Sequence, residues 1–492
     1  MVDVAGEEER SIGRKAAGGF VWALIGFIVM QIGSFATYSI ASKILGTEGI
    51  GVVGVALLIV FWIDILLSVG MGASLIFDQE KGQTERVAIA FTVNVTVGSV
   101  LAALIFFGAP FINDVVKAGD ANIFRVVALL IVVKSLGQVP DAMLKRDLDF
   151  RRRARADFTR SGLRFVVSIA LLKAGLGPVA MVMGVVVAEI AATTLTWFLV
   201  RFKPVLRFDR LIAAEMLRFG AAMFGAQLVG MLWLQGDYLV LISRYGANSP
   251  ELGNYYTAFR LPELVLGSVY NMFSSVAFPA YSAARESGDD KLRDASLKSL
   301  KVLCLFGFPA GIGMSLIARD FITWFFGADF ADAIAVLELL GVAGAFVAVG
   351  FASGDLFAAV GKPRLGLYFG LVFVPILMGG FIAVVDRGIV AIAIVHVAVI
   401  IPYSAFRIEV ANRLLGTTWK QSLAALRPAA AASVGILALA LPVRLSLDAG
   451  FVSLLAIMFA GLLGAIAGLA VGDRAMLDEV RAGADKAIAK IR

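Results

Sequence analysis

Long apolar segments, separated by short polar loops, follow one another along almost the whole chain. Most of them are close to the ~20 apolar residues that cross a bilayer core as a helix. This pattern predicts an all-α, polytopic membrane protein with about 14 transmembrane helices. The predicted spans are residues 17–42, 50–77, 87–109, 123–143, 158–175, 178–200, 219–243, 254–280, 300–318, 333–359, 365–384, 389–411, 428–442 and 451–471.

The composition supports a membrane protein. Hydrophobic residues make up 60% of the chain and charged residues 16%, whereas soluble domains have roughly 45–50% apolar and about 25% charged residues. The 51 glycines suit close packing of helices in lipid. Three pairs have the G-x-x-x-G spacing of such contacts: Gly307 and Gly311, Gly366 and Gly370, and Gly464 and Gly468.

Basic residues are distributed unequally between the two sets of alternating loops. Of the 44 Lys and Arg residues, 34 fall on the side of the N-terminus and eight on the other side. Lys and Arg accumulate in cytosolic loops, so we expect both termini to be cytosolic. The net charge of +7 then reflects membrane topology, and we expect no nucleic-acid partner.

A weak internal repeat suggests how the helices are grouped. ILGTEGIGVVGVA follows the first span, and RYGANSPELGNYYTA follows the seventh, about 200 residues later. The repeat predicts two pseudo-symmetric six-helix lobes plus two C-terminal helices, with a site between the lobes. The expected parts are a cytosolic N-terminus (1–15), an N-lobe (16–205), a C-lobe (206–412), two further helices (413–471) and a cytosolic amphipathic tail (472–492).

Signatures of catalysis are missing from the sequence. It has one cysteine, Cys304, and one histidine, His396, and it contains no P-loop motif. We therefore expect no catalytic residues, no metal site and no cofactor, and transport is favoured over catalysis. His396 lies in an apolar run, IAIVHVAVI, where it is either hydrogen-bonded between helices or part of a proton relay.

Polar and aromatic residues recur at helical spacing inside several predicted spans, most clearly between Arg218 and Tyr281. Ionisable groups at membrane depth are costly and usually face a cavity or a partner. Aromatic faces stack on sugar rings, and polar side chains meet sugar hydroxyls, so this lining suits a sugar. The predicted substrate-cavity residues are Arg260, Glu263, Asp237, Asp64, Tyr256, Tyr270, Asn271, Gln31, Tyr38 and Gln227.

Two further hypotheses concern the same charges. Asp64 and Glu189 are candidates for binding a coupling ion, because an apolar surrounding favours the protonated carboxyl group. Arg260 and Glu263 are three residues apart near Pro262, so they alternatively pair with each other near a helix end.

Four motifs resemble the Wzx-type polysaccharide flippases, in particular exporters similar to those for colanic acid and succinoglycan. Leu45–Gly51 (LGTEGIG) is similar to the family's L-G-P-E-D-F-G, although Thr47 replaces Pro and Gly49 replaces Asp. The others are Leu67–Leu75 (LSVGMGASL), Val139–Arg153 (VPDAMLKRDLDFRRR) and Gly361–Arg364 (GKPR). The family belongs to the multidrug/oligosaccharidyl-lipid/polysaccharide exporter superfamily.

The resemblance implies a non-enzymatic flippase of the bacterial inner membrane. It implies alternating access around a central cavity and movement of undecaprenyl-pyrophosphate-linked oligosaccharide repeat units across the membrane, in exopolysaccharide, capsule or lipopolysaccharide biosynthesis. Expected partners are this substrate, membrane lipids, and the polymerase and chain-length proteins of the same pathway.

Three alternatives remain open. A flippase for the lipid-linked peptidoglycan precursor would also suit 14 spans, and a cation-coupled multidrug exporter would normally have twelve. A membrane enzyme of polysaccharide assembly would need a large outward loop with catalytic residues, and the longest outward loops here are short.

Overall fold

The computed structural model describes residues 2–77, 83–146, 149–474 and 476–478. These residues form α-helices and short 3₁₀ or π segments, without a β-strand. The helices are α1 (Val2–Phe77), α2 (Gln83–Val116), α3 (Asn122–Arg146), α4 (Phe150–Lys173), α5 (Pro178–Val200), α6 (Arg210–Tyr245), α7 (Pro250–Pro262), α8 (Ser268–Glu286), α9 (Asp289–Phe325), α10 (Ala333–Ala359), α11 (Arg364–Val384), α12 (Ile389–Leu415), α13 (Trp419–Ser446) and α14 (Phe451–Gly472). The all-α membrane fold is confirmed.

Ten helical stretches in the described part of the chain are long and apolar enough to cross a membrane. One of them, Val29–Leu67, includes parts of the first two predicted spans, which lie on either side of Gly46 in α1. Helices α4 and α6, and the pair α7 and α8, are not among the ten. The total of about 14 spans therefore stays a prediction.

The described chain forms two compact units. Unit 1 consists of residues 1–231 and 245–253, and unit 2 of residues 232–244 and 254–492. The chain passes between them within α6, after Met231. The lobe boundaries expected from the repeat stay a prediction, and the expected amphipathic tail lies mostly outside the described residues.

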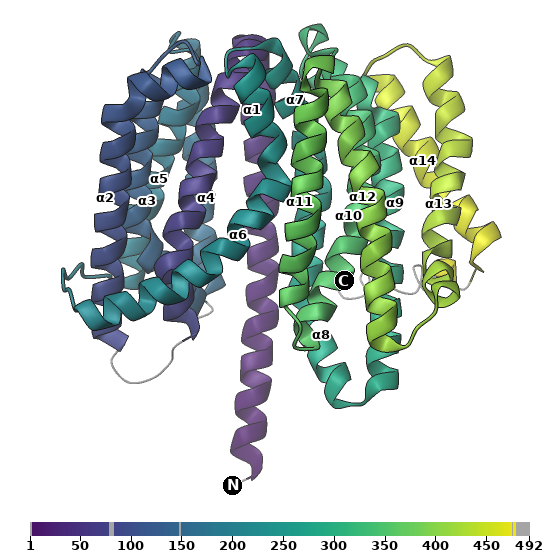
Figure 1. The fold of residues 1–492 in the computed structure, drawn as a ribbon, viewed down its shortest axis with the longest axis horizontal. Coiled ribbons are helices and arrows are strands. Elements are labelled where there is room, and N and C mark those ends of the chain that lie inside the picture. The colour runs from purple at the N-terminus through teal and green to yellow at the C-terminus, as the bar shows by residue number, and fades with distance from the viewer. Residues whose placement is uncertain (1, 78–82, 147–148, 475, 479–492) are drawn as a thin grey trace. The chain divides into compact units, whose positions relative to one another are not determined.

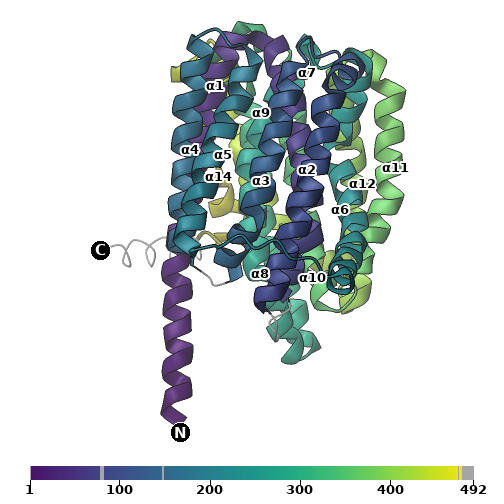
Figure 2. The ribbon, with the colours of Figure 1, turned by 90° about the vertical axis from the view of Figure 1, so that its left-hand side faces the viewer.

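Unit 1 is a bundle in which α4 packs on α1 and α5, while α3 packs on α2, α5 and α1 (Figures 1 and 2). A buried cluster around Phe91 and Val139, with Trp197 and Phe202 against it, joins α2, α3 and α5. Small residues set the helix spacing: a Cβ on Gly137 of α3 would lie 2.7 Å from Thr193 Oγ1 of α5.

The two hairpins of the internal repeat touch each other within unit 1. A Cβ on Gly51 would lie 2.4 Å from the carbonyl oxygen of Ala247, and one on Gly253 would lie 1.9 Å from that of Thr47. Only glycine allows two backbones to approach so closely. One glycine of each repeat segment thus lies where the hairpins meet.

In unit 2, α10 packs against α8, α9 and α12, and α13 and α14 pack on each other and on α9 (Figure 1). The predicted contact at Gly464 and Gly468 is confirmed: a Cβ on Gly464 would lie 2.2 Å from the Gly435 carbonyl oxygen. The contact at Gly311 is confirmed as well, with the Gly341 carbonyl oxygen 2.4 Å away, whereas Gly366 has no neighbour within 4 Å.

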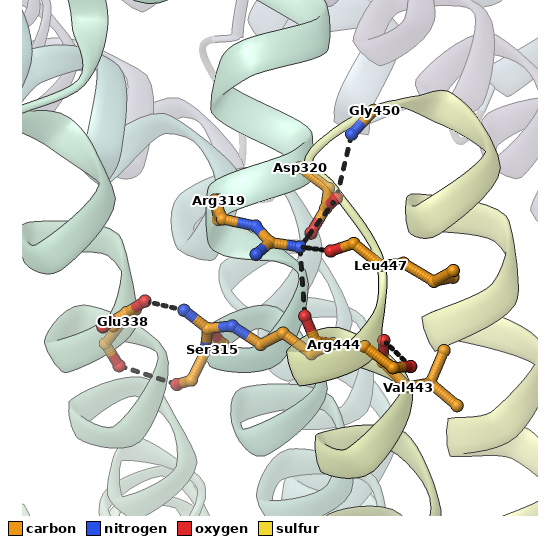
Figure 3. Close-up of polar contacts among 9 residues, drawn as sticks. Ser315, Arg319, Asp320, Glu338, Val443, Arg444, Leu447 and Gly450 are labelled. Atoms are coloured by element: carbon orange, nitrogen blue, oxygen red, sulfur yellow. Dashed lines mark hydrogen bonds and ion pairs between the residues drawn. The ribbon is translucent and has the colours of Figure 1, made fainter.

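An ionic clamp, formed by Arg319, Asp320, Glu338 and Arg444, anchors the turn between α13 and α14 (Figure 3). The Arg319 guanidinium donates to the carbonyl oxygens of Arg444 and Leu447, near the end of α13, at 3.2 and 2.9 Å. The fully buried Asp320 accepts from the Gly450 N–H, before α14, at 3.0 Å. Arg444 pairs with Glu338 of α10. The intramembrane charge of Glu338 thus has a structural role.

Candidate functional site

A cavity of about 420 Å³ lies within unit 1. Four helices line it, and each contributes at least one charged residue. The lining residues are Phe61, Asp64 and Ile65 of α1, Lys134, Gly137, Gln138 and Asp141 of α3, Arg160 of α4, and Glu189, Thr193 and Thr196 of α5. Its volume is within the range of ~300–1,000 Å³ typical of small-molecule sites.

Two ion pairs join neighbouring helices in the wall of the cavity. Lys134 Nζ lies 2.6 Å from Asp64 Oδ2, and the two residues are 70 positions apart in the sequence. Arg160 binds both oxygens of Glu189, at 2.9 and 3.2 Å, and also bonds Asp157 Oδ1 at 2.6 Å. Bidentate contacts of this kind hold a guanidinium in a fixed orientation. The pairs connect α1 to α3 and α4 to α5.

A second polar cluster lies inside unit 2 around Asp237 of α6. Asp237 is 1% exposed, and its Oδ2 accepts a hydrogen bond from the Tyr255 hydroxyl at 2.6 Å. The same oxygen lies 3.0 Å from Nε2 of His396 in α12, and Oδ1 accepts from the Tyr238 N–H. Rings of Phe259 and Phe381 flank the imidazole. The only histidine in the chain therefore contacts a buried carboxylate.

The cavity brings together two of the predicted residues, Asp64 and Glu189. Gln31 is half-buried and Tyr38 buried in α1, and Gln227 of α6 is exposed. These three do not line the cavity, and no finding tests their predicted role in binding substrate.

The remaining predicted residues belong to unit 2. Arg260 pairs with Glu263 at 3.1 Å, next to the π-helical segment Glu263–Gly267, as the local-pairing alternative expected. The half-buried Tyr256 ring contacts Tyr238. The buried Tyr270 hydroxyl donates to the Gly344 carbonyl oxygen at 2.9 Å. The side chain of Asn271 lies outside the described side chains.

Sequence reasoning missed several residues of these clusters. It did not include Lys134, Gln138 or Arg160 in the site, nor the partnership of His396 with Asp237. The sequence did contain a signal for these residues: each carboxylate at membrane depth needs a partner, and a basic side chain at similar depth on another helix is a candidate for it. Within the part of the chain that the structure describes, no cluster of three or more His, Cys, Asp and Glu residues is placed to hold a metal ion.

Comparison with known families gives a direct match. Residues 40–335, more than half of the chain, match a family model described as "Polysaccharide biosynthesis protein". The chain belongs to this family. The resemblance inferred from the sequence motifs is therefore confirmed.

Curated relatives of this family member include three named proteins. The chain is 26% identical over 383 residues to "Lipopolysaccharide biosynthesis protein WzxC" of Escherichia coli K12, which covers 76% of this chain and 77% of the relative. It is 26% identical to "Teichuronic acid biosynthesis protein TuaB" of Bacillus subtilis, covering 62% and 63%. It is 25% identical to "Succinoglycan biosynthesis transport protein ExoT" of Rhizobium meliloti, covering 62% and 61%.

Solved structures show the fold. "Lipid II flippase MurJ, inward closed conformation" superposes with a TM-score of 0.75, at 14% identity, over 93% of this chain and 99% of that one. An inward-facing multidrug resistance MATE family transporter superposes with a TM-score of 0.59, at 16% identity, over 81% and 96%. The chain has the fold of these membrane transporters.

Proposed function

We propose that this protein is a flippase that moves undecaprenyl-pyrophosphate-linked oligosaccharide repeat units across the bacterial inner membrane by alternating access. It serves exopolysaccharide, capsule or lipopolysaccharide biosynthesis and catalyses no covalent chemistry. The observation that carries the proposal is the charged cavity of unit 1, because a purely structural bundle in lipid has no need of an open polar cavity. The family and the transporter fold support it.

The topology follows from the loop charges. With both termini cytosolic, the substrate enters from the cytosolic leaflet and leaves in the periplasmic leaflet, where the polymerase and chain-length proteins of the pathway act. The 34 basic residues on the N-terminal side support this orientation. Basic residues at that surface also attract anionic membrane lipids.

Ion coupling has two candidate locations. Asp64 and Glu189 are each paired with a fixed cation, so a coupling ion must compete with Lys134 or Arg160. Asp237 instead has a phenol and an imidazole as neighbours, and no lysine or arginine of the described chain is shown to bind it. The Asp237 cluster is therefore the stronger candidate for proton coupling.

The test measures leaflet sidedness in proteoliposomes. A lipid-linked oligosaccharide is incorporated, and a membrane-impermeant glycosidase reports the accessible fraction over time. We expect protein-dependent movement of this lipid, reduced at least tenfold by Arg160→Ala at a matched amount of folded protein. An Arg387→Ala variant, which changes an exposed residue of unit 2, is the control.

Two alternatives are resolved by the same vesicles. Movement of the peptidoglycan precursor in place of oligosaccharide lipids would establish a peptidoglycan-precursor flippase. Gradient-driven extrusion of small organic cations would establish a multidrug exporter. Either result, without movement of an oligosaccharide lipid, would overturn the proposal.

A further inference from the structure

Both cations that line the unit 1 cavity are already paired with carboxylates. Lys134 is bound by Asp64, and the Nε, Nη1 and Nη2 atoms of Arg160 are each bonded to Glu189 or Asp157. The lining contains two cations and three carboxylates, and the third carboxylate, Asp141, pairs at 3.8 Å with Arg153, which is not a lining residue. The formal charge of the lining is thus −1. A pyrophosphate group, which carries at least two negative charges, would have to compete with the carboxylates that already bind Lys134 and Arg160, inside a lining of net negative charge.

Two other polar groups of the same cavity have hydrogen-bonding capacity left. The second carboxylate oxygen of Asp64, Oδ1, is buried and has no hydrogen-bond partner. The Gln138 amide lines the cavity and makes no hydrogen bond to any described residue. A buried acceptor without a partner is costly, so it is normally satisfied by water or a ligand. An amide that offers both donors and an acceptor can serve neighbouring hydroxyl groups.

An aromatic ring completes this set. Phe61 is 38% exposed and lines the cavity. It precedes Asp64 by three residues in α1, so the ring and the free carboxylate oxygen are on the same face of that helix. A ring face, a free acceptor and a free amide match a sugar, which offers apolar C–H faces and hydroxyl donors and acceptors.

We infer that the unit 1 cavity binds an uncharged sugar of the transported lipid, and that the pyrophosphate group of that lipid is bound outside this cavity. The inference rests on the proposed function and specifies its substrate class. Asp64, Gln138 and Phe61 contact the sugar, and the two ion pairs hold the wall in shape. Lys134 and Arg160 are positioning residues, because they pair with Asp64 and Glu189 and do not contact the sugar.

Cysteine accessibility tests this assignment. The single native cysteine, Cys304, is buried, and Cys304→Ser gives a background without thiols. Gln138→Cys is introduced into this background, and its rate of reaction with a small charged methanethiosulfonate reagent is measured in proteoliposomes. Lys173→Cys, an exposed position at the end of α4, is the matched control. The probes are undecaprenyl pyrophosphate alone and the same lipid carrying an uncharged oligosaccharide or an acidic one.

We expect the uncharged oligosaccharide lipid to slow labelling of Gln138→Cys at least fivefold, while undecaprenyl pyrophosphate alone and the Lys173→Cys control show no change. Equal protection by undecaprenyl pyrophosphate alone would place the pyrophosphate in the cavity and overturn the inference. Protection confined to the acidic oligosaccharide lipid would also overturn it.

Transport is measured on the same vesicles to separate this inference from the proposed function. Movement of the uncharged oligosaccharide lipid without protection of Gln138→Cys would overturn the sugar site and leave the flippase standing. Absence of both movement and protection would overturn both. As a second readout, Gln138→Leu is expected to reduce transport of the oligosaccharide lipid tenfold, with unchanged thermal stability, because an apolar side chain of similar size fills the same space.

Discussion

The imidazole of His396 lies against the carboxylate of Asp237, with 3.0 Å between Nε2 and Oδ2. The two residues are 159 positions apart and come from α12 and α6. Tyr255 donates to the same oxygen. Since a buried carboxylate is stable only when it is hydrogen-bonded or neutralised, this contact helps to hold α6 and α12 together.

The first prediction concerns this pair. Asp237→Asn should lower the rate of lipid movement at least tenfold, because the amide removes the negative charge that lies against His396 and Tyr255. His396→Gln should keep a hydrogen bond but remove the response of the rate to a pH gradient across the vesicle membrane. The rate is measured with and without the gradient. Asp386→Asn, an exposed carboxylate in unit 2, is the control, and an unchanged gradient response in His396→Gln would exclude the coupling role.

The second prediction concerns the pair of Asp64 and Lys134. Asp64→Lys should reduce the amount of folded protein, because it places two cations side by side in a partly buried wall. The exchanged pair, Asp64→Lys with Lys134→Asp, should restore most of the stability, since a charged hydrogen bond contributes about 1.5–3 kcal/mol. Melting curves in detergent measure this recovery. Transport should stay low in the exchanged pair, because the free acceptor would lie on the other helix.

The third prediction concerns Arg260. We expect Arg260→Ala to reduce export while the protein level in the membrane stays normal, because the arginine lies in the last turn of α7 and pairs with the first residue of a π-helical segment, a feature common at functional sites. Glu263→Gln, which removes the charge of its partner, is the comparison variant. Wild-type export by Arg260→Ala at equal expression would remove the residue from the site.

The fourth prediction tests the ionic clamp. Arg319→Ala removes the ion-pair partner of the fully buried Asp320 and two hydrogen bonds to carbonyl oxygens near the end of α13. We expect the free energy of unfolding to fall by about 2–3 kcal/mol. This is less than the full cost of breaking a buried ion pair, because Arg319 is itself partly exposed. Thermal unfolding in detergent measures it, with Arg387→Ala as the control. A shift no larger than that of the control would show that the clamp contributes little.

The fifth prediction concerns the hairpin glycines. Gly253→Ala places a methyl group 1.9 Å from the Thr47 carbonyl oxygen, and Gly51→Ala places one 2.4 Å from that of Ala247. Each substitution should lower the free energy of unfolding by about 1–3 kcal/mol, because the added methyl group overpacks the contact. Gly108→Ala in α2 has no neighbour within 4 Å and should be neutral or stabilising. Equal melting temperatures for all three variants would contradict this contact.

The sequence by itself determined the membrane class, the approximate positions of the helices, the basic side of the loops and the family. These properties follow from local quantities, namely the length of apolar runs, the count of Lys and Arg in loops, and short motifs such as Leu45–Gly51. Apolar length decides insertion into a bilayer irrespective of which helix becomes a neighbour. The repeat segments that contain Gly51 and Gly253 were also visible in the sequence, whereas their contact was not.

Only the tertiary structure decided which charges are partners. Asp64 is bound by Lys134, Glu189 by Arg160, and Asp237 lies against His396, and each pair joins separate helices. Helical spacing places residues on a face of their own helix but gives no information on which helix that face meets, because every apolar face is equally soluble in lipid. The difference between a charge that is free to bind substrate and one that is held by a neighbour is therefore a property of the packed bundle.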